Sequence, residues 1–398
     1  IEPPLDRDDL FNPFEARLRQ VAADGHKHLF YTTAGNIGLW GAGFLTPVPR
    51  VLLDIFRDAY RASAGEELVP EGWPMPVATG PDPDLVLHTL AAMTHMPAED
   101  LLELRSLLED KKQLILEGPP GAGKTYLADL LARWVADEPL EGDTENGRVE
   151  LVQFHQSYGY EDFVQGLRPR LKDDKVVFEV VDGIFLDLCR RASNDPDNPY
   201  VLIIDEINRG NLSRIFGELL MALEYRDKAV RLPYGETPLR IPDNLYLIGT
   251  MNSTDRSLAL IDYALRRRFY FHRLQPSQDG NAPVYRNWLE SRGLPDADRA
   301  RLHRLFVNLN SEIGRQLSDD FQIGHSYFMR DDIHTTQGLH RIWKHAVTPL
   351  LQEYFHTARD RKEALARFTI SSRLGRSATD EPATTDDFAA ANDEGADQ

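Results

Sequence analysis

The stretch Gly118-Pro-Pro-Gly121-Ala-Gly123-Lys124-Thr125 decides the fold. Its spacing is G-x-x-x-x-G-K-[ST], the pattern of a phosphate-binding loop. A short apolar strand is predicted just before it, over 113–117, and an amphipathic helix just after it, over 125–135. The glycines let backbone N–H groups wrap phosphates, and the start of the helix adds a positive dipole end. We therefore expect a nucleotide to be held by the whole loop, namely Gly118, Pro119, Pro120, Gly121, Ala122, Gly123, Lys124 and Thr125.

The last two residues of this loop are expected to contact the phosphates and the metal ion. We expect the Lys124 amine to reach the β- and γ-phosphates, and the Thr125 hydroxyl to bind Mg²⁺. The alternative is a glycine-rich turn that arose by chance. That alternative does not account for the strand before the loop and the helix after it.

A second apolar run, over 201–204, ends in two adjacent carboxylates, Asp205 and Glu206. We expect Asp205 to hold Mg²⁺, directly or through water, and Glu206 to orient and polarise the attacking water. Alone, such a pair is as often a solvated cap, but together with the phosphate loop it predicts nucleotide hydrolysis. Asn208 and Arg209 follow, and either face the nucleotide or a neighbouring subunit or form a surface turn.

A third strand, predicted over 245–250, delivers Asn252 to the same carboxyl edge of the sheet, where ligands of open α/β sheets bind. Its neutral amide can hold the lytic water or sense the γ-phosphate without adding negative charge. Asp255 follows three residues later and would position the water or a partner's arginine. Its alternative is a turn or a helix cap. Both residues are candidates for the hydrolytic site.

Three consecutive arginines, Arg266, Arg267 and Arg268, end a short predicted helix just before the last strand. Neighbouring helical positions point about 100° apart, so the three cannot share one task. Burying them without anions would also be costly. We expect Arg266 or Arg267, or both, to reach the γ-phosphate of an adjacent subunit and to stabilise transition-state charge. The alternative is a set of surface arginines bound to carbonyls at the end of the helix.

Around these motifs, residues 101–275 alternate strands and helices. This alternation predicts an α/β fold with a five-stranded, mostly parallel sheet covered on both faces. The remaining strands are expected over 149–154 and 269–274, and a helix is expected over 212–223.

The rest of the chain is predicted to lack this alternation. Residues 276–375 show helical stripes only, with an expected kink at Pro349, and predict a small helical lid domain. Residues 1–100 have a weak helix-and-loop pattern, with helices expected over 11–21 and 51–62. Residues 376–398 form an acidic low-complexity tail, which cannot bury enough surface to fold.

The composition of the 398 residues is ordinary for a soluble protein, with 42% hydrophobic and 27% charged residues. No run of about 18 apolar residues and no signal segment occurs, so we expect a cytoplasmic chain without a membrane span. A single cysteine, Cys189, excludes an internal disulfide and a thiol metal cluster. The net charge of −18 would repel nucleic acid, so a DNA contact needs a local basic patch or another subunit.

Together these elements resemble the AAA+ fold. The residues within these motifs resemble those of the McrB family, the GTP-hydrolysing motors of McrBC modification-dependent restriction systems. The segment Met251-Asn-Ser-Thr-Asp-Arg-Ser257 is similar to that family's MNxxDRS signature, and supporting segments lie at 154–163, 205–213 and 323–328. The resemblance covers about residues 101–355.

The resemblance implies an AAA+ P-loop NTPase that forms a ring, usually a hexamer, with nucleotide at the subunit interfaces. It implies GTP (or ATP) and Mg²⁺ as cofactors, places Asn252 and Asp255 in the hydrolytic site, and assigns the nuclease to a separate McrC-type subunit. DNA would be reached through the ring, through an N-terminal module removed upstream, or through that partner. His325, in the lid, is either a sensor near the phosphates or a core histidine with satisfied bonds.

A MoxR-type ATP-dependent protein remodeller is the main alternative, because that related clade shares the phosphate loop, the acidic pair and the arginines. A third hypothesis is a nucleotide-gated scaffold with slow hydrolysis, against which the intact Asp205–Glu206 pair argues. The preference for GTP rests on the resemblance alone, because the chain lacks the guanine signature of the small GTPases.

Overall fold

The computed structural model describes residues 30–33 and 36–39, and residues 83–369 apart from 143, 145–146, 173–174, 236–237, 255–262 and 279. The chain divides into two compact units, Ile1–Leu85 and Val86–Gln398. In the first unit, strands β1 (Phe30–Thr33) and β2 (Asn36–Leu39) pair in antiparallel fashion. The helices predicted over 11–21 and 51–62, and the acidic tail, lie outside the described residues.

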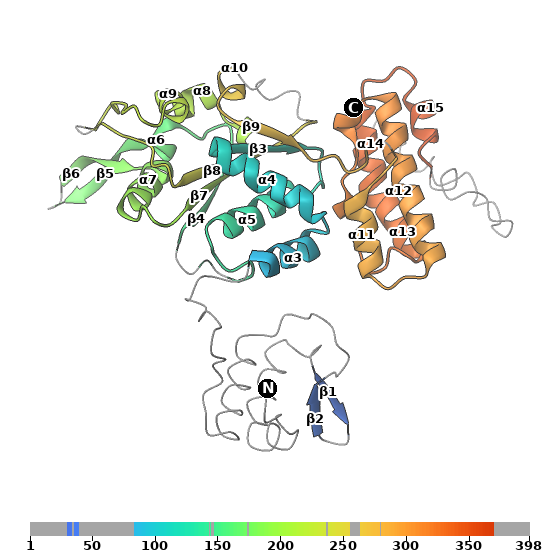
Figure 1. The fold of residues 1–398 in the computed structure, drawn as a ribbon. Helices are drawn as coiled ribbons and strands as arrows, with labels where there is room; N and C mark the ends of the chain where they lie inside the picture. Colours follow the sequence, from blue (N-terminus) through green and yellow to red (C-terminus); the bar gives the residue numbers. More distant parts are fainter. Residues whose placement is uncertain are drawn as a thin grey trace, which may run out of the picture. The chain divides into compact units, whose positions relative to one another are not determined.

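The second unit is built on a parallel sheet of five strands in the order β4-β7-β8-β3-β9 (Figure 1). Every pair of neighbouring strands in it is parallel, which confirms the predicted α/β fold. The strands are short and rich in Leu, Ile and Val because helices cover both faces. Their bounds are β3 (Gln113–Gly118), β4 (Val149–Gln153), β7 (Tyr200–Asp205), β8 (Leu245–Asn252) and β9 (Tyr270–Arg273).

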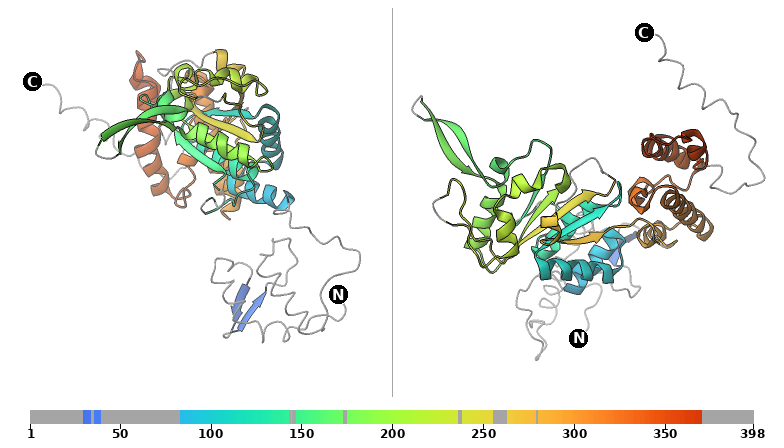
Figure 2. Two further views of the ribbon diagram at one scale, coloured as in Figure 1. Left: turned by 90° about the vertical axis from the view of Figure 1, so that its left-hand side faces the viewer. Right: turned by 90° about the horizontal axis from the view of Figure 1, so that it is seen from above.

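Alternate side chains of these strands enter two separate hydrophobic clusters. Leu114, Val201 and Ile203 pack with α3 (Pro83–Thr94), α4 (Ala98–Lys111) and α5 (Lys124–Val135). Ile115, Leu202 and Ile204 pack on the other face, under α6 (Tyr160–Phe163), α7 (Ile184–Asn194), α8 (Leu212–Phe216) and α9 (Leu219–Glu224). The sheet is therefore the middle layer of three, as Figures 1 and 2 show.

One predicted helix was wrong as a single element. The segment 212–223 is split into α8 and α9 at Gly217, whose backbone has φ 48° and ψ −125°. A positive φ favours glycine and interrupts helical geometry. The apolar periodicity on both sides of the glycine made the two short helices look like one.

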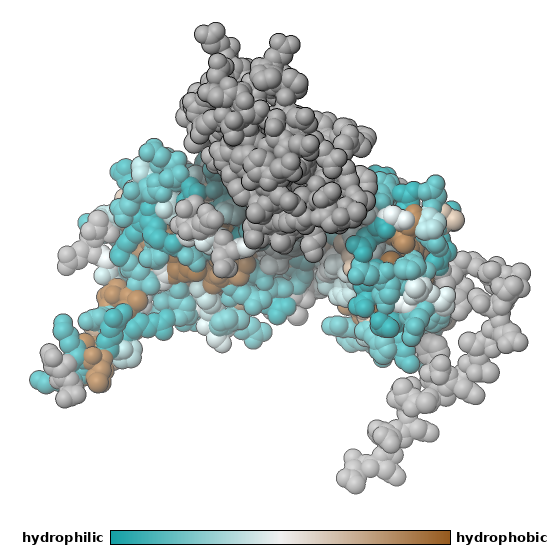
Figure 3. Space-filling model, turned by 90° about the horizontal axis from the view of Figure 1, so that it is seen from below, coloured by the Kyte–Doolittle hydropathy of each residue, from teal (hydrophilic) through white to brown (hydrophobic). Residues whose placement is uncertain are grey.

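A β-hairpin that the sequence analysis missed projects from this unit (Figure 2). Its strands, β5 (Gln165–Lys172) and β6 (Lys175–Asp182), pair in antiparallel fashion away from the central sheet. Leu171 and Phe178 on one of its faces are 74% and 68% exposed. Figure 3 shows hydrophobic residues in brown on this hairpin. The face that carries Leu171 and Phe178 is made of Leu167, Pro169, Leu171, Val176, Phe178 and Val180.

The lid is helical, as predicted, and has a hydrophobic core of its own. Near the predicted kink the helical run continues through a π-helical turn, η5 (Trp343–Val347), that ends two residues before Pro349. Proline lacks the N–H that an α-helical hydrogen bond needs, and a wider turn accommodates the loss. The lid helices are α11 (Pro283–Ser291), α12 (Asp296–Gln316), α13 (Thr336–Ile342), α14 (Thr348–Tyr354) and α15 (Arg361–Ala366).

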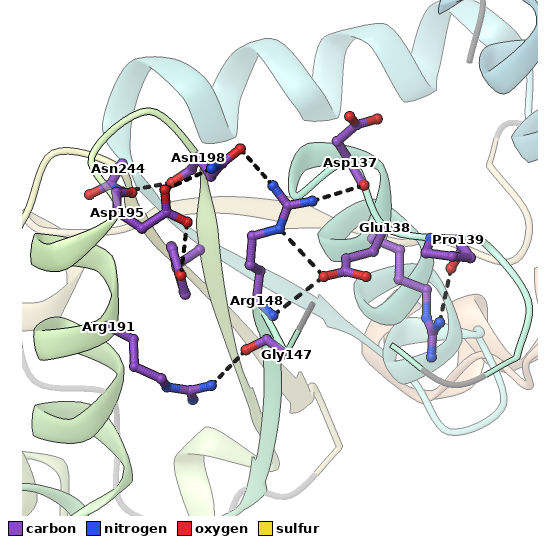
Figure 4. A network of polar contacts seen from close by, with 11 residues as sticks. Asp137, Glu138, Pro139, Gly147, Arg148, Arg191, Asp195, Asn198 and Asn244 are labelled. Atoms are coloured by element: carbon purple, nitrogen blue, oxygen red, sulfur yellow. Dashed lines mark hydrogen bonds and ion pairs between the residues drawn. The ribbon is translucent and has the colours of Figure 1, made fainter. Parts of the chain in front are cut away.

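A polar network lies at the amino ends of β4 and β7, opposite the phosphate loop (Figure 4). Arg148 donates to the Asn198 amide oxygen at 2.9 Å and to the Asp137 carbonyl at 3.2 Å, and it pairs with Glu138 at 3.5 Å. The Asn244 amide donates to three carbonyls, including that of Asn198 at 2.7 Å. The Arg148 bonds fasten the start of the edge strand β4 to the end of α5 and to the loop before β7, and the Asn244 bonds fasten the start of β8 to the end of α7.

None of the helices in the described part combines the length and the apolar character that crossing a membrane requires.

Candidate functional site

The carboxyl ends of three adjacent strands bring the predicted residues together. β3 ends at Gly118, β7 ends at Asp205, and β8 ends at Asn252. β8 lies between the other two strands in the sheet. Parallel strands place all their carboxyl ends on one edge, which is where open α/β sheets bind ligands.

The phosphate loop has the backbone that its glycines were expected to give. Gly121 and Gly123 have φ of 76° and 81°, and helix α5 begins at Lys124 directly afterwards. Lys124 is only 8% exposed, and its Nζ donates to the Pro119 carbonyl at 2.9 Å and to Asn252 Oδ1 at 2.7 Å. The amine is thus held inside the loop, against the neighbouring strand.

Asp205 collects three donors. Its Oδ1 accepts from the hydroxyls of Thr125 at 2.6 Å and Thr250 at 2.7 Å, and its Oδ2 accepts from the Gln153 amide at 3.2 Å. A hydroxyl beside a carboxylate is the oxygen donor set that Mg²⁺ prefers, with substrate phosphates completing the shell. Across the described residues, no three His, Cys, Asp or Glu side chains form a metal site by themselves. Thr125 and Asp205 therefore fit Mg²⁺ that arrives with a nucleotide.

Glu206 has an uncommon backbone conformation, and each of its carboxylate oxygens has a different partner. Its φ of 53° and ψ of 45° are left-handed, which is costly for a residue with a side chain and is concentrated at functional sites. Its Oε1 accepts from the Asn252 amide at 2.8 Å, and its Oε2 pairs with Arg209 at 3.2 Å, in the short helix η2 (Ile207–Arg209). Asn252 thereby joins Lys124 to Glu206 through one amide group.

The segment after Asn252 is described only in part. Ser253 donates from its hydroxyl to the Asp320 carbonyl of the lid at 2.9 Å. Asp255 lies outside the described residues, so its predicted place in the hydrolytic site stays a prediction.

The three arginines have different surroundings, as predicted, although only Arg266 lies within the helix. Arg268 is 8% exposed, donates to the Leu220 carbonyl, and pairs with Glu224 at 2.7 Å. Arg267 is 67% exposed, and the exposed Arg266 lies over the ring of Phe271 at 5.2 Å. Arg268 thus serves the fold, while Arg266 and Arg267 project from α10 (Tyr263–Arg266) and the turn after it.

The lid is fastened directly to the phosphate loop. Gly324 N–H donates to the Pro120 carbonyl at 3.0 Å, and Ser326 N–H donates to the Gly121 carbonyl at 3.1 Å. A Cβ on Gly324 would lie 1.8 Å from the carbonyl carbon of Gly121, so only glycine allows this approach. His325 stands between these two bonds, at the start of the short helix η4 (His325–Tyr327).

A cavity of about 250 Å³ opens beside the loop and extends between the core and the lid. Apolar side chains, including Met96, form much of its lining, and Asp100 and His325 add polar groups. Burial and the neighbouring Glu99 raise the pKa of the Asp100 carboxyl above its ordinary value. The cavity adjoins the phosphate loop at Ala122 and Gly123.

Sequence reasoning missed several of these residues. Thr250 is 1% exposed within an apolar strand, and a buried hydroxyl signals a required hydrogen bond. Gln153 ends a strand, as the other site residues do. Gly324 entered the sequence analysis only as part of the segment 323–328, and Asp100 gave no signal, because only the folded chain brings the lid and α4 to the loop.

Two family models match the chain. The AAA domain (dynein-related subfamily) matches residues 113–269, and the alpha-helical lid domain of McrB matches residues 301–363. The first match lies within the part of the chain that carries the central sheet, and the second lies within the helical lid, which has a hydrophobic core of its own.

Two curated relatives are components of restriction enzymes. The chain is 42% identical over 274 residues to the type IV methyl-directed restriction enzyme EcoKMcrB subunit of Escherichia coli (strain K12), a match that covers 65% of this chain and 57% of the relative. It is 25% identical over 212 residues to the type II restriction enzyme BsuMI component YdiS of Bacillus subtilis (strain 168), covering 43% and 59%. The matches thus span somewhat more than half of each relative.

Proposed function

Because the chain belongs to the McrB family of AAA+ P-loop NTPases, we propose that it is the motor of a restriction system. It assembles as a ring, hydrolyses GTP in preference to ATP with Mg²⁺, and drives DNA translocation for a separate McrC-type nuclease subunit. The observation that carries the hydrolytic part is the continuous network that links Lys124, Asn252 and Glu206 beside the Thr125–Asp205 pair.

The network suggests how nucleotide would prepare the site. Phosphate oxygens are stronger acceptors for an ammonium group than an amide oxygen is. When Lys124 turns to them, Asn252 is released, and its amide can orient the attacking water together with Glu206. Glu206 then polarises that water for in-line attack, and Thr125 and Asp205 hold the Mg²⁺ that neutralises charge on the phosphates.

The remaining parts of the site come from an assembled ring. Arg266 and Arg267 are exposed, and the pair that Arg267 makes with Glu224 is long, at 3.8 Å, so both side chains can reach a neighbouring subunit. An arginine supplied in trans stabilises the charge of the transition state. Asp255 is proposed to position the water or that arginine. Hydrolysis therefore depends on assembly.

A carboxylate in the cavity supports the preference for guanine. Asp100 lines the space beside the loop, and an ionised carboxylate only accepts hydrogen bonds. Guanine presents N–H donors at N1 and N2, whereas adenine presents an acceptor at N1 and no amine at C2. Asp100 is partly buried, and a base that pairs with its carboxylate is bound more tightly than one that leaves it unpaired.

The restriction context is supported by the two relatives, which are a restriction enzyme subunit and a restriction enzyme component. Each belongs to an enzyme of more than one part, which agrees with a motor whose nuclease lies on another chain. Because the net charge is −18, DNA contact would need a local basic patch or another subunit or domain.

Steady-state hydrolysis of GTP and ATP, measured side by side with Mg²⁺ over a range of protein concentrations, tests this proposal. We expect GTP to be preferred and the specific rate to rise steeply with concentration. Asp100→Asn should reduce the GTP-to-ATP ratio at least about tenfold, because the amide can also donate. A preference for ATP would contradict the guanine assignment and favour the protein remodeller.

A further inference from the structure

The helical lid holds a second cavity, of about 550 Å³, that the proposed function does not use. Its lining comes from η4 and the loop after it, and from α13 and η5. Part of the lining is apolar and part carries nitrogen groups, from Tyr327, Ile342 and Ala346 and from Arg330, Arg341 and His345. Among the described residues that form it, none contributes a carboxylate. Such a lining fits a ligand that is both acidic and apolar.

The two arginines of this cavity share one carboxylate. Arg330 Nε lies 3.2 Å from Asp332 Oδ1, and Arg341 Nη1 lies 2.9 Å from Asp332 Oδ2. The two arginine side chains are 48% and 51% exposed, so both guanidinium groups also face solvent. A guanidinium has five N–H donors, and one carboxylate cannot accept from all of those on two arginines. Two positive charges against one negative charge therefore leave room for a second acidic group.

The surroundings of Tyr327 set the direction of such a ligand. Burial and the nearby Glu353 raise the pKa of the Tyr327 hydroxyl above its ordinary value. A ligand carboxylate would be repelled by Glu353 here, whereas an apolar ring can pack against Tyr327 and Ile342. The ligand thus needs carboxylates that meet the arginines and an apolar side chain a short distance further along.

The acidic tail of this same chain has that composition. Residues 377–398 contain seven carboxylates, no Lys or Arg, and a single aromatic residue, Phe388. Two of the carboxylates, Asp386 and Asp387, directly precede this ring in the sequence. The segment 386–388 therefore offers two negative charges followed by one large apolar group, which complements the two parts of the cavity lining.

The last described residues of the lid are bonded to the helical run that lines the cavity. Trp343 Nε1 donates to the Phe368 carbonyl at 2.7 Å, and Trp343 directly follows Ile342. The 18 residues from Phe368 to Asp386 can span up to about 60 Å, whereas a helix with its side chains is about 10–12 Å wide. A tethered segment meets its site at about millimolar effective concentration, so a dissociation constant of about 0.1 mM is sufficient for docking.

We infer that this cavity is a docking site for the acidic tail of the same chain, which it binds through the segment 386–388. The two aspartates pair with the two arginines, and the phenylalanine ring lies against Tyr327 and Ile342. The docking needs neither nucleotide nor a second subunit, so it does not depend on the proposed function. Because the paired groups are partly exposed, salt weakens their attraction.

A fluorophore on the tail of the full chain tests the docking. Ala391→Cys adds a thiol for labelling, since Cys189 is 1% exposed and does not compete. The anisotropy of the label should be high at low ionic strength and should fall when NaCl is raised to about 0.5 M. Anisotropy that does not change with salt would overturn the inference. Anisotropy that rises with protein concentration would place the tail on a second copy and would overturn docking within one chain.

Substitutions in the lid locate the site. Arg330→Gln together with Arg341→Gln should weaken docking at least about thirtyfold, which brings the anisotropy to its high-salt value, because two charged contacts are lost. Arg304→Gln together with Arg315→Gln is the matched control, since it removes the same charge from exposed positions of α12 outside the cavity lining. Denaturant unfolding checks that both double variants are folded. An equal fall of anisotropy in the control would show a general attraction to the lid and overturn the site.

Substitutions in the tail identify the segment and leave every described residue of the lid unchanged. Asp386→Asn together with Asp387→Asn should lower the anisotropy, and so should Phe388→Ala alone. Asp393→Asn together with Glu394→Gln removes the same charge and should leave the anisotropy unchanged. Equal effects of the two charge pairs would overturn the assignment to 386–388. Unchanged anisotropy in Phe388→Ala would overturn the contact of the ring with the apolar lining.

Discussion

The two ends of the central sheet both carry dense polar networks, and they differ in how the charges are matched. At the amino ends, Arg148 is directed to a carboxylate and to neutral oxygens, and the Glu138 side chain that pairs with it is 0% exposed. At the carboxyl ends, Asp205 and Glu206 stand side by side, and Glu206 has a left-handed backbone. We propose that the first arrangement holds the fold together and that the second keeps charged groups available to a ligand. If so, the two networks respond differently to mutation.

The largest expected effect is on the ligand-binding end. Lys124→Ala should weaken binding of GDP and Mg²⁺ at least about a hundredfold, because the amine that meets the phosphates is lost. Lys111→Ala, at the end of α4 over the ring of Tyr270, should leave affinity unchanged. Calorimetric titration of both variants measures the difference, and equal affinities would contradict the assignment of the loop.

Mutations at the amino ends of the strands should change the stability of the fold instead of ligand affinity. Arg148→Ala leaves Glu138 buried without its arginine, and the free energy of unfolding should fall by about 3 kcal/mol. Arg170→Ala removes a pair with Glu179 in which both side chains are exposed, and it should cost less than about 0.5 kcal/mol. Denaturant unfolding measures both. If the folded Arg148→Ala variant lost GDP affinity without losing stability, this would contradict the proposed difference between the amino and carboxyl ends of the sheet.

The smallest expected effect is a dependence on pH. His325 has a pKa of about 4 in the folded chain and an ordinary value of 6.5 when unfolded, so the unfolded chain binds more protons between these values. Stability should therefore fall as pH is lowered from 6.5. In His325→Phe this fall between pH 6.5 and 5.5 should be smaller by about 1 kcal/mol.

Other groups around that ring bear on the measurement. Burial also lowers the pKa of His95 and His272, and Asp100 and Arg273 line the same cavity. All of them are present in both proteins, so the difference between the two curves isolates His325. Identical curves would show that folding does not lower the pKa of His325.

The sequence was most informative where a pattern has one physical meaning. The loop from Gly118 to Thr125, the acidic pair after β7 and Asn252 after β8 were predicted correctly as neighbours, because parallel strands align their carboxyl ends. The strand bounds were close for the same reason: buried strands read as short apolar runs.

What could not be predicted depends on contacts distant in sequence. The bonds from Gly324 and Ser326 to the loop, and the orphan nitrogen of His325, exist only when the lid has docked. The division of 212–223 into two helices depended on the backbone of a single glycine, Gly217. The hairpin β5–β6 was missed because one of its strands carries arginine, proline and lysine.

The most direct test of the hydrolytic site is Glu206→Gln. The substitution keeps the size of the side chain and removes the carboxylate that polarises water, so GTP turnover should fall at least about a hundredfold while GDP and GTP still bind with nearly normal affinity. Single-turnover hydrolysis beside calorimetric titration gives both numbers on one preparation. Turnover near that of the unmodified chain would contradict the role of Glu206, and with it the network that joins Glu206 through Asn252 to Lys124.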